Sequence, residues 1–195
     1  MNFQNLLIFV AVVVVVWCLV IYFWPAMLLS VFKRGFLHYG LGGGPVSFNT
    51  LCTQPQELFK DPFNAPSSAP KALSSGVNHD TLLTAGWLDL SKGSQILHVP
   101  DMQDRYYSVQ FTDPTKNTVF AYVGKRTTGT QEGDFLITGP GWKGSVPDGM
   151  KQIPSPKNGV MVIGRVLVES DSDLPTAYDL SKQIQLSPYS NQFVS

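Results

Sequence analysis

The first part of the chain has no charge. No Asp, Glu, Lys or Arg precedes Lys33, whereas all 14 basic and all 14 acidic side chains follow from there on. The formal net charge of zero gives no basic field that would attract nucleic acid. Nucleic acid is therefore not an expected partner. The distribution of charge indicates an apolar segment joined to a domain of ordinary polarity.

Cysteine is scarce, and glycosylation signals are missing. Cys18 lies inside the apolar segment and Cys52 well beyond it, so a framework of disulfides is excluded. No Asn-x-Ser/Thr triplet occurs anywhere in the chain. Both absences favour a domain that faces the cytosol.

Motifs for metals and for catalysis are missing as well. His38, His79 and His98 share no metal-ligand spacing with one another or with Cys52, and neither H-x-x-x-H nor C-x-x-C occurs. The S-x-x-K pattern that starts at Ser30 stands at the edge of the apolar segment without companion motifs, and no G-x-S-x-G is present. We therefore predict no metal, no cofactor and no catalytic residue.

The apolar segment has the length of a membrane span. Nineteen uncharged residues, 6–24, begin at Leu6 and end at Trp24, and as a helix they would be ~28 Å long, close to the thickness of the hydrocarbon layer. A cleaved signal peptide is the second interpretation, but the chain lacks a basic start and a small-residue cleavage pattern. A buried core helix is third, since no polar face is present. Lys33 and Arg34 follow the span, so the positive-inside rule places the rest of the chain in the cytoplasm.

The organisation changes after the span. Pro25 predicts a break, after which residues 27–39 form a short juxtamembrane helix that ends at the glycine cluster 40–44. Residues 54–75 are rich in proline and serine, with low potential for helix or strand. We therefore predict an anchor with an interfacial helix over 1–32, a connection wrapping the domain over 33–76, and a β domain over 77–195.

Strand patterns fill the second half. Short runs with β-branched or aromatic content, separated by turn residues, predict strands at 81–88, 95–99, 106–111, 118–123, 134–138 and 159–168. Asp173 precedes a predicted helix that places Leu174, Ala177, Leu180 and Ile184 on one face. The predicted fold is mostly β, a jelly-roll-like antiparallel sandwich with an N-terminal transmembrane helix and a C-terminal helix.

Two sets of residues are candidates for a site. A pocket, or a polar cluster that only supports the fold, would use five residues: Asn78, Asp80, Thr81, Trp87 and Arg105. Two loop tips at one end of the sandwich would make contacts with partners through Thr127, Thr128, Thr130, Trp142 and Lys143. Asp101, Asp104 and Asp113 could form an acidic cluster with Arg105, although turn-forming aspartates explain them equally well.

Three long segments carry a family resemblance. They are NHDTLLTAGWLDLSKG (78–93), DRYYSVQFTDPTKNTVFAYVGKRTTGT (104–130) and GDFLITGPGWKG (133–144). From Val20 to its end the chain resembles the family of domain of unknown function 1254. The resemblance implies a jelly-roll-like β domain without a settled activity, which in many bacterial members precedes a second β domain. Family members carry a tyrosine where this chain has Leu83, so any pocket role of that tyrosine would be lost here.

The expected function is noncatalytic. We expect an integral, single-pass membrane protein whose partners are the lipid bilayer and other proteins of a larger assembly. The most specific form of this expectation is a minor capsid protein that links an internal viral membrane to the shell, by analogy with jelly-roll capsid domains. The alternative is a membrane-tethered envelope enzyme or small-molecule binder that acts with a second β domain.

Overall fold

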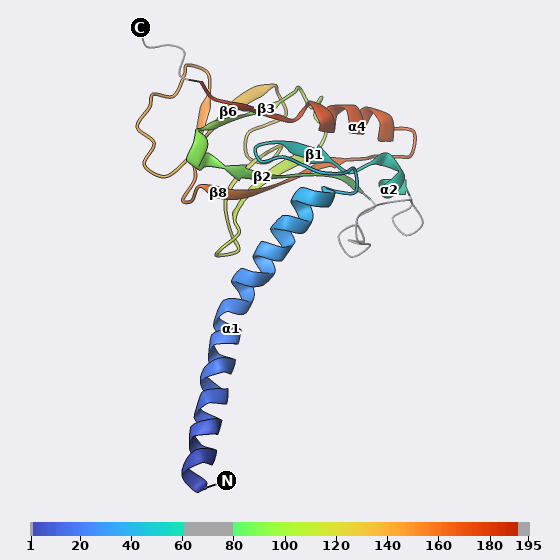
Figure 1. Cartoon of the computed structure of the whole chain (residues 1–195). Helices are drawn as coiled ribbons and strands as arrows, with labels where there is room; N and C mark the ends of the chain where they lie inside the picture. The colour runs from blue at the N-terminus through green and yellow to red at the C-terminus, as the bar shows by residue number, and fades with distance from the viewer. Residues whose placement is uncertain (1, 61–79, 191–195) are drawn as a thin grey trace. The chain divides into compact units, whose positions relative to one another are not determined.

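The computed structural model describes residues 2–60 and 80–190 of the chain (Figure 1). The chain divides into two compact units, Met1–Arg34 and Gly35–Ser195, and each is described by itself. The first unit holds most of one long helix, and the second holds all the strands found in the described residues.

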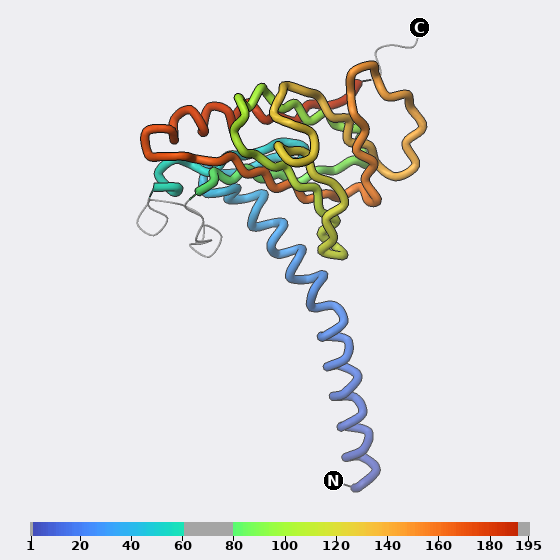
Figure 2. Tube along the Cα trace, turned by 180° about the vertical axis from the view of Figure 1, so that it is seen from behind, coloured from blue at the N-terminus to red at the C-terminus, as the bar shows by residue number. Residues whose placement is uncertain are grey.

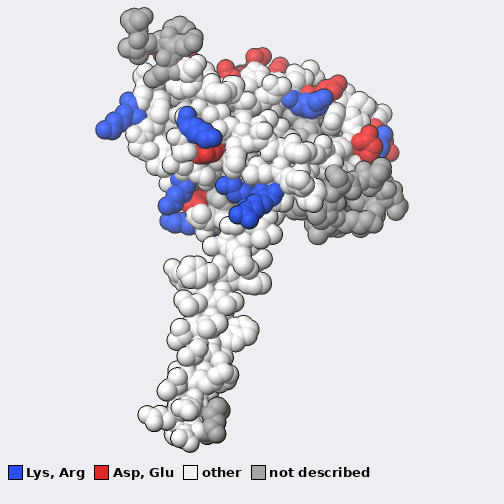
Figure 3. Space-filling view, in the orientation of Figure 1, with Lys and Arg blue, Asp and Glu red and all other residues white. Residues whose placement is uncertain are grey.

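Helix α1 (Phe3–Tyr39) contains the whole apolar segment. It is long and apolar enough to cross a membrane, and none of its most apolar stretch is buried. This exposure contradicts the interpretation as a core helix. In the space-filling view its visible surface carries no charged atoms below its upper end (Figure 3).

The predicted break at Pro25 is wrong. Residues 27–39 continue the same helix, and Pro25 lies inside it. A proline removes one backbone hydrogen bond and crowds the preceding turn, and apolar membrane helices tolerate this change where neighbouring backbone adjusts. The anchor and the predicted juxtamembrane helix are therefore one element.

The glycine cluster ends α1 as predicted. Gly40 has φ +57°, and its N–H donates to the Phe36 carbonyl over 2.7 Å. A left-handed residue after the last helical turn is the usual stop signal, and glycine adopts it without strain. Phe36, in this last turn, belongs to the second unit and is buried.

The second unit is built from two sheets (Figures 1 and 2). The five-stranded sheet has the order β1-β2-β8-β4-β5 and the four-stranded sheet the order β7-β6-β3-β9. Six strands match the predicted ones: β2 (Thr81–Asp89), β3 (Gln95–Val99), β4 (Tyr107–Asp113), β5 (Thr118–Gly124), β6 (Gly133–Thr138) and β8 (Gly159–Leu167). The mostly β, two-sheet class is therefore confirmed.

One pairing differs from an all-antiparallel sandwich. Strand β7 (Lys151–Pro154) pairs with β6 in parallel, with Phe135 opposite Lys151. The segment 139–150 returns the chain to the starting end of β6, and a parallel pair requires a crossover connection of this kind. The sandwich is therefore mixed, not purely antiparallel.

The main apolar core lies between the layers. Leu82, Tyr107 and Phe111 are among its fully buried side chains. Helix α4 (Leu174–Gln183) contacts β1, β2 and β8, and its predicted apolar face is buried as expected at Leu174, Ala177, Leu180 and the following Ile184. The helix therefore closes one side of the sandwich.

Short elements escaped the sequence pattern. They are β1 (Leu51–Thr53), α2 (Gln56–Lys60), the 3-10 turn η1 (Leu90–Lys92), β7 and β9 (Gln185–Pro188). Helix α2 lies where low helix potential was predicted, because Leu58 and Phe59 are buried and stabilise it. Most of the predicted wrapping connection, residues 61–76, lies outside the described residues.

Candidate functional site

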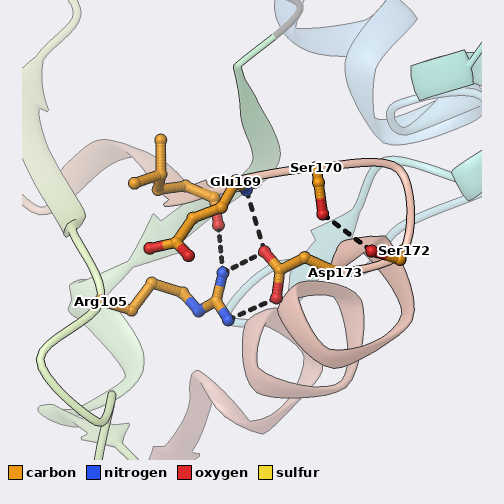
Figure 4. A network of polar contacts seen from close by, with 6 residues as sticks. Arg105, Glu169, Ser170, Ser172 and Asp173 are labelled. Carbon is orange, nitrogen blue, oxygen red and sulfur yellow. Dashed lines mark hydrogen bonds and ion pairs between the residues drawn. The ribbon is translucent and has the colours of Figure 1, made fainter.

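Arg105 lies at the centre of the polar network in Figure 4. It precedes β4, and both of its terminal nitrogens donate to the carboxylate of Asp173, Nη1 over 2.5 Å and Nη2 over 2.7 Å. Nη1 also donates to the carbonyl of Leu167 over 2.8 Å. The guanidinium therefore clamps the end of β8 to the start of α4.

The carboxylate of Asp173 also has several hydrogen-bond partners. Asp173 stands immediately before α4, and its Oδ2 accepts a further hydrogen bond from the N–H of Glu169 over 2.9 Å. The Arg105 side chain is 12% exposed and that of Asp173 17%. Hydrogen bonds from Arg105 hold the pKa of Asp173 below its usual range, and the same bonds raise the pKa of Arg105.

This geometry is that of a structural clamp. The carboxylate receives three hydrogen bonds, so little acceptor capacity is left for a substrate. Of the Arg105 nitrogens, buried Nε has no partner among the described residues. The predicted set of residues was either a pocket or a polar cluster that supports the fold. The arrangement of Arg105 favours the polar cluster.

The remaining members of that cluster are dispersed. Asn78 lies outside the described residues. Asp80 is exposed, and its carbonyl accepts from the N–H of Val168, which brings it near the clamp only through backbone. Thr81 begins β2 opposite Leu167.

Trp87 lies toward the other end of β2. It pairs with Met161 and is 2% exposed. Side chains alternate between the faces of a strand, and Trp87 is absent from the main core although Leu82 and Leu88 belong to it. The structure therefore does not bring Trp87 and Arg105 into one pocket.

The aspartates of the alternative acidic cluster serve turns and one ion pair. Asp101 accepts from the N–H of Gln103, and Asp113 accepts from the N–H and the hydroxyl of Thr115. Asp104 pairs with Lys125 over 2.8 Å. Among residues 2–60 and 80–190 no group of three or more His, Cys, Asp or Glu side chains is placed to hold a metal.

The two candidate loops are separated by a strand. Thr127, Thr128 and Thr130 precede β6, whereas Trp142 and Lys143 follow it. Six residues of strand extend over roughly 20 Å, so the prediction that both loops share one end of the sandwich is wrong. In the first loop, Thr128 Oγ1 accepts from the N–H of Gly124, which fixes the turn after β5.

A hollow on the five-stranded sheet is lined mostly by residues that were not predicted as a site. It has a volume of about 400 Å³, and its lining includes Tyr106, Ser108, Tyr122, Arg126 and Arg165. The alternation of side chains along β4 and β8 indicates which residues of each strand share a face. Only the register, which sets Ser108 opposite both Gly124 and Arg165, brings them together.

The family model described as protein of unknown function (DUF1254) matches residues 63–188, well over half of the chain. The chain belongs to this family. The matched DUF1254 region begins at residue 63, later than the resemblance from Val20 implied.

A solved structure is similar to part of this chain. The crystal structure of the VPA0106 protein from Vibrio parahaemolyticus is 27% identical to this chain, with a TM-score of 0.54. The match covers 62% of this chain and 34% of that one, so this DUF1254 chain spans about a third of the length of that relative. No curated protein matches the chain.

Proposed function

We propose that this protein is a single-pass membrane-anchored interaction module whose β domain binds another protein and performs no reaction of its own. The anchor is α1, because a helix whose first thirty residues carry no charge and expose their apolar side chains is stable in lipid and poorly soluble in water. The use of Arg105 as a clamp supports a structural role for the polar network around it.

The observation that carries the proposed interaction is an apolar hollow at an open edge of the sandwich. Strand β5 ends the five-stranded sheet and β7 ends the other. Between them lies a hollow of about 320 Å³ whose lining includes Phe120, Ala121, Phe135 and Ile153. Its lining is predominantly apolar, and Phe120 is only partly buried against the core.

An open edge of this kind suits a strand from a partner. Among residues 2–60 and 80–190, β5 pairs with β4 alone, so its other side presents N–H and C=O groups that no strand pairs. An extended segment that added to β5 would pair with these groups and place side chains in the apolar hollow. We infer a partner protein that supplies such a strand at the same membrane.

Photocrosslinking tests this surface in the full chain. A photoreactive amino acid replaces Ala121 at the edge, and in a control chain it replaces Lys92, which is exposed in η1. In the native membrane, position 121 should yield one adduct of defined mass and position 92 should not. Absence of an adduct at 121, or the same adduct from both positions, contradicts the proposal.

We further infer that the β domain faces the cytoplasm. Lys33 and Arg34 follow the apolar segment, and basic residues beside a span are retained on the cytoplasmic side. A Lys92→Cys variant should react with a membrane-impermeant maleimide only after the cells are opened. Burial raises the pKa of the Cys52 thiol, which keeps its background labelling low, and labelling of the variant in intact cells would reverse the orientation.

The narrowest form of this proposal is a minor capsid protein that links an internal viral membrane to a capsid. It rests on the analogy between jelly-roll domains and this sandwich, which concerns fold alone. Fixed-stoichiometry recovery of the full chain with a capsid protein from purified virions would support it, and absence of the chain from virions would contradict it.

A further inference from the structure

The hollow on the outer face of the five-stranded sheet has the composition of a binding site. Its floor includes the small residues Ser108 and Gly124, which lie opposite each other on β4 and β5. Arg165 lies opposite Ser108 on the other side, on β8. Tyr106, Tyr122 and Arg126 complete the walls. A volume of about 400 Å³ falls within the range of small-molecule sites.

The charges of the hollow are of one sign. Arg126 and Arg165 line it, and no Asp or Glu does. In residues 2–60 and 80–190 neither arginine has a carboxylate within 4.0 Å, whereas Arg105 is paired with Asp173 and Lys125 with Asp104. Two unneutralised guanidinium groups beside one hollow favour an anion.

The geometry also provides donors in fixed positions. Arg126 lies over the ring of Tyr106, 5.5 Å from its centroid, which restricts the guanidinium. Tyr122 donates to Gln110, and the Thr127 hydroxyl donates to backbone carbonyls, so both hydroxyls are committed to the protein. The hydroxyl of Ser108 has no partner in the described part of the chain and can donate to a ligand.

We propose that this hollow binds a phosphate ester, either of a free small molecule or of an anionic lipid head group. A phosphate offers several acceptor oxygens to the two guanidinium forks and to Ser108, and an attached group would lie against Tyr106 or Tyr122. This hollow shares Tyr122 and Val123 with the β5–β7 edge hollow, but Ser108, Arg126 and Arg165 line this hollow and not the other, so the phosphate site does not require the partner strand proposed above.

Binding of phenyl phosphate to the full chain in phosphatidylcholine nanodiscs tests the site. We expect saturable binding that weakens as NaCl is added. Arg165→Gln and Arg126→Gln should each weaken it at least tenfold, because each removes a charged donor. Lys116→Gln, which removes one positive charge from the exposed β4–β5 turn outside the hollow, should change it less than twofold.

A second variant separates loss of charge from loss of fold. Ser108→Leu fills the floor without changing the charge and should also abolish binding, with the thermal unfolding of the β domain kept within a few degrees of the parent. Absence of saturable binding by the parent chain, or equal binding by the parent and both arginine variants, overturns the proposal.

Nanodiscs that contain phosphatidylglycerol identify the source of the phosphate. If phenyl phosphate binds more weakly in these discs than in discs without the anionic lipid, to the same extent for the parent and for Lys116→Gln, the site is assigned to a lipid head group. Unchanged binding assigns it to a free phosphate ester. Both results support a phosphate site and differ only in its occupant.

Discussion

The clamp between Arg105 and Asp173 should be the most consequential ion pair of the β domain. Its two side chains are 12% and 17% exposed, and the contact is bidentate. Removing one partner of a buried pair leaves the other charge without compensation. Asp173→Ala should therefore lower the free energy of unfolding by about 3 kcal/mol, at the lower end for buried pairs because Leu167 O still accepts from Arg105.

The double-mutant cycle gives the energy of the pair itself. Arg105→Met should cost about 2 kcal/mol, since the Asp173 carboxylate keeps the N–H of Glu169. The double variant should be no less stable than Asp173→Ala alone, which corresponds to a coupling of about 2 kcal/mol. Asp173 makes no side-chain capping bond to α4, so loss of a helix cap does not contribute.

Urea unfolding of the full chain in mild detergent measures these values. Trp87 is 2% exposed, and its fluorescence reports the unfolding of the β domain. The matched control is the exposed pair of Lys125 and Asp104, whose coupling should stay below about 1 kcal/mol. A coupling for the clamp no larger than that of this control would refute the reasoning.

The same pair predicts a dependence on pH. The pKa of Asp173 is lower in the folded chain than in the unfolded one, because Arg105 donates to its carboxylate. Its contribution is therefore complete above the unfolded value of about 3.9 and is lost as the pH falls through the folded value. Below pH 4 the free energy of unfolding should fall less steeply with decreasing pH in Asp173→Asn than in the parent. Equal slopes of this free energy against pH would contradict the prediction.

Three further predictions concern the anchor, its last turn and one hairpin. Val14→Lys should release much of the protein from membranes on carbonate extraction, since a charge at the centre of a span costs about 3 kcal/mol; retention like that of the parent would contradict the anchor. Gly40→Ala should lower the melting temperature, because φ is +57° and a Cβ would lie 2.7 Å from a backbone oxygen, whereas Gly35→Ala meets nothing within 4 Å and should not. Asp113→Ala should cost about 1–2 kcal/mol in urea unfolding by removing both hydrogen bonds from Thr115, and a loss below 0.5 kcal/mol would show that the turn forms without them.

Local patterns sufficed for the regular elements. The uncharged run from residue 6 to 24 predicted a helix, and six strands were found within a few residues of their actual bounds. The apolar spacing after Asp173 predicted α4 and its buried face. These features depend on residues close in sequence, for which composition and periodicity carry the information.

The tertiary structure decided the rest. Edge strands β1, β7 and β9 exist because they pair with longer strands, and their three or four residues carry no pattern of their own. Arg105 was a candidate from the sequence, but its partner Asp173 lies 68 residues away. The hollow beside Arg165 required the register of β4 with both of its neighbours. The sequence by itself determined which segments are helix, strand and apolar anchor, and only long-range packing determined which polar groups meet, because pairing between distant strands leaves no signal in either strand alone.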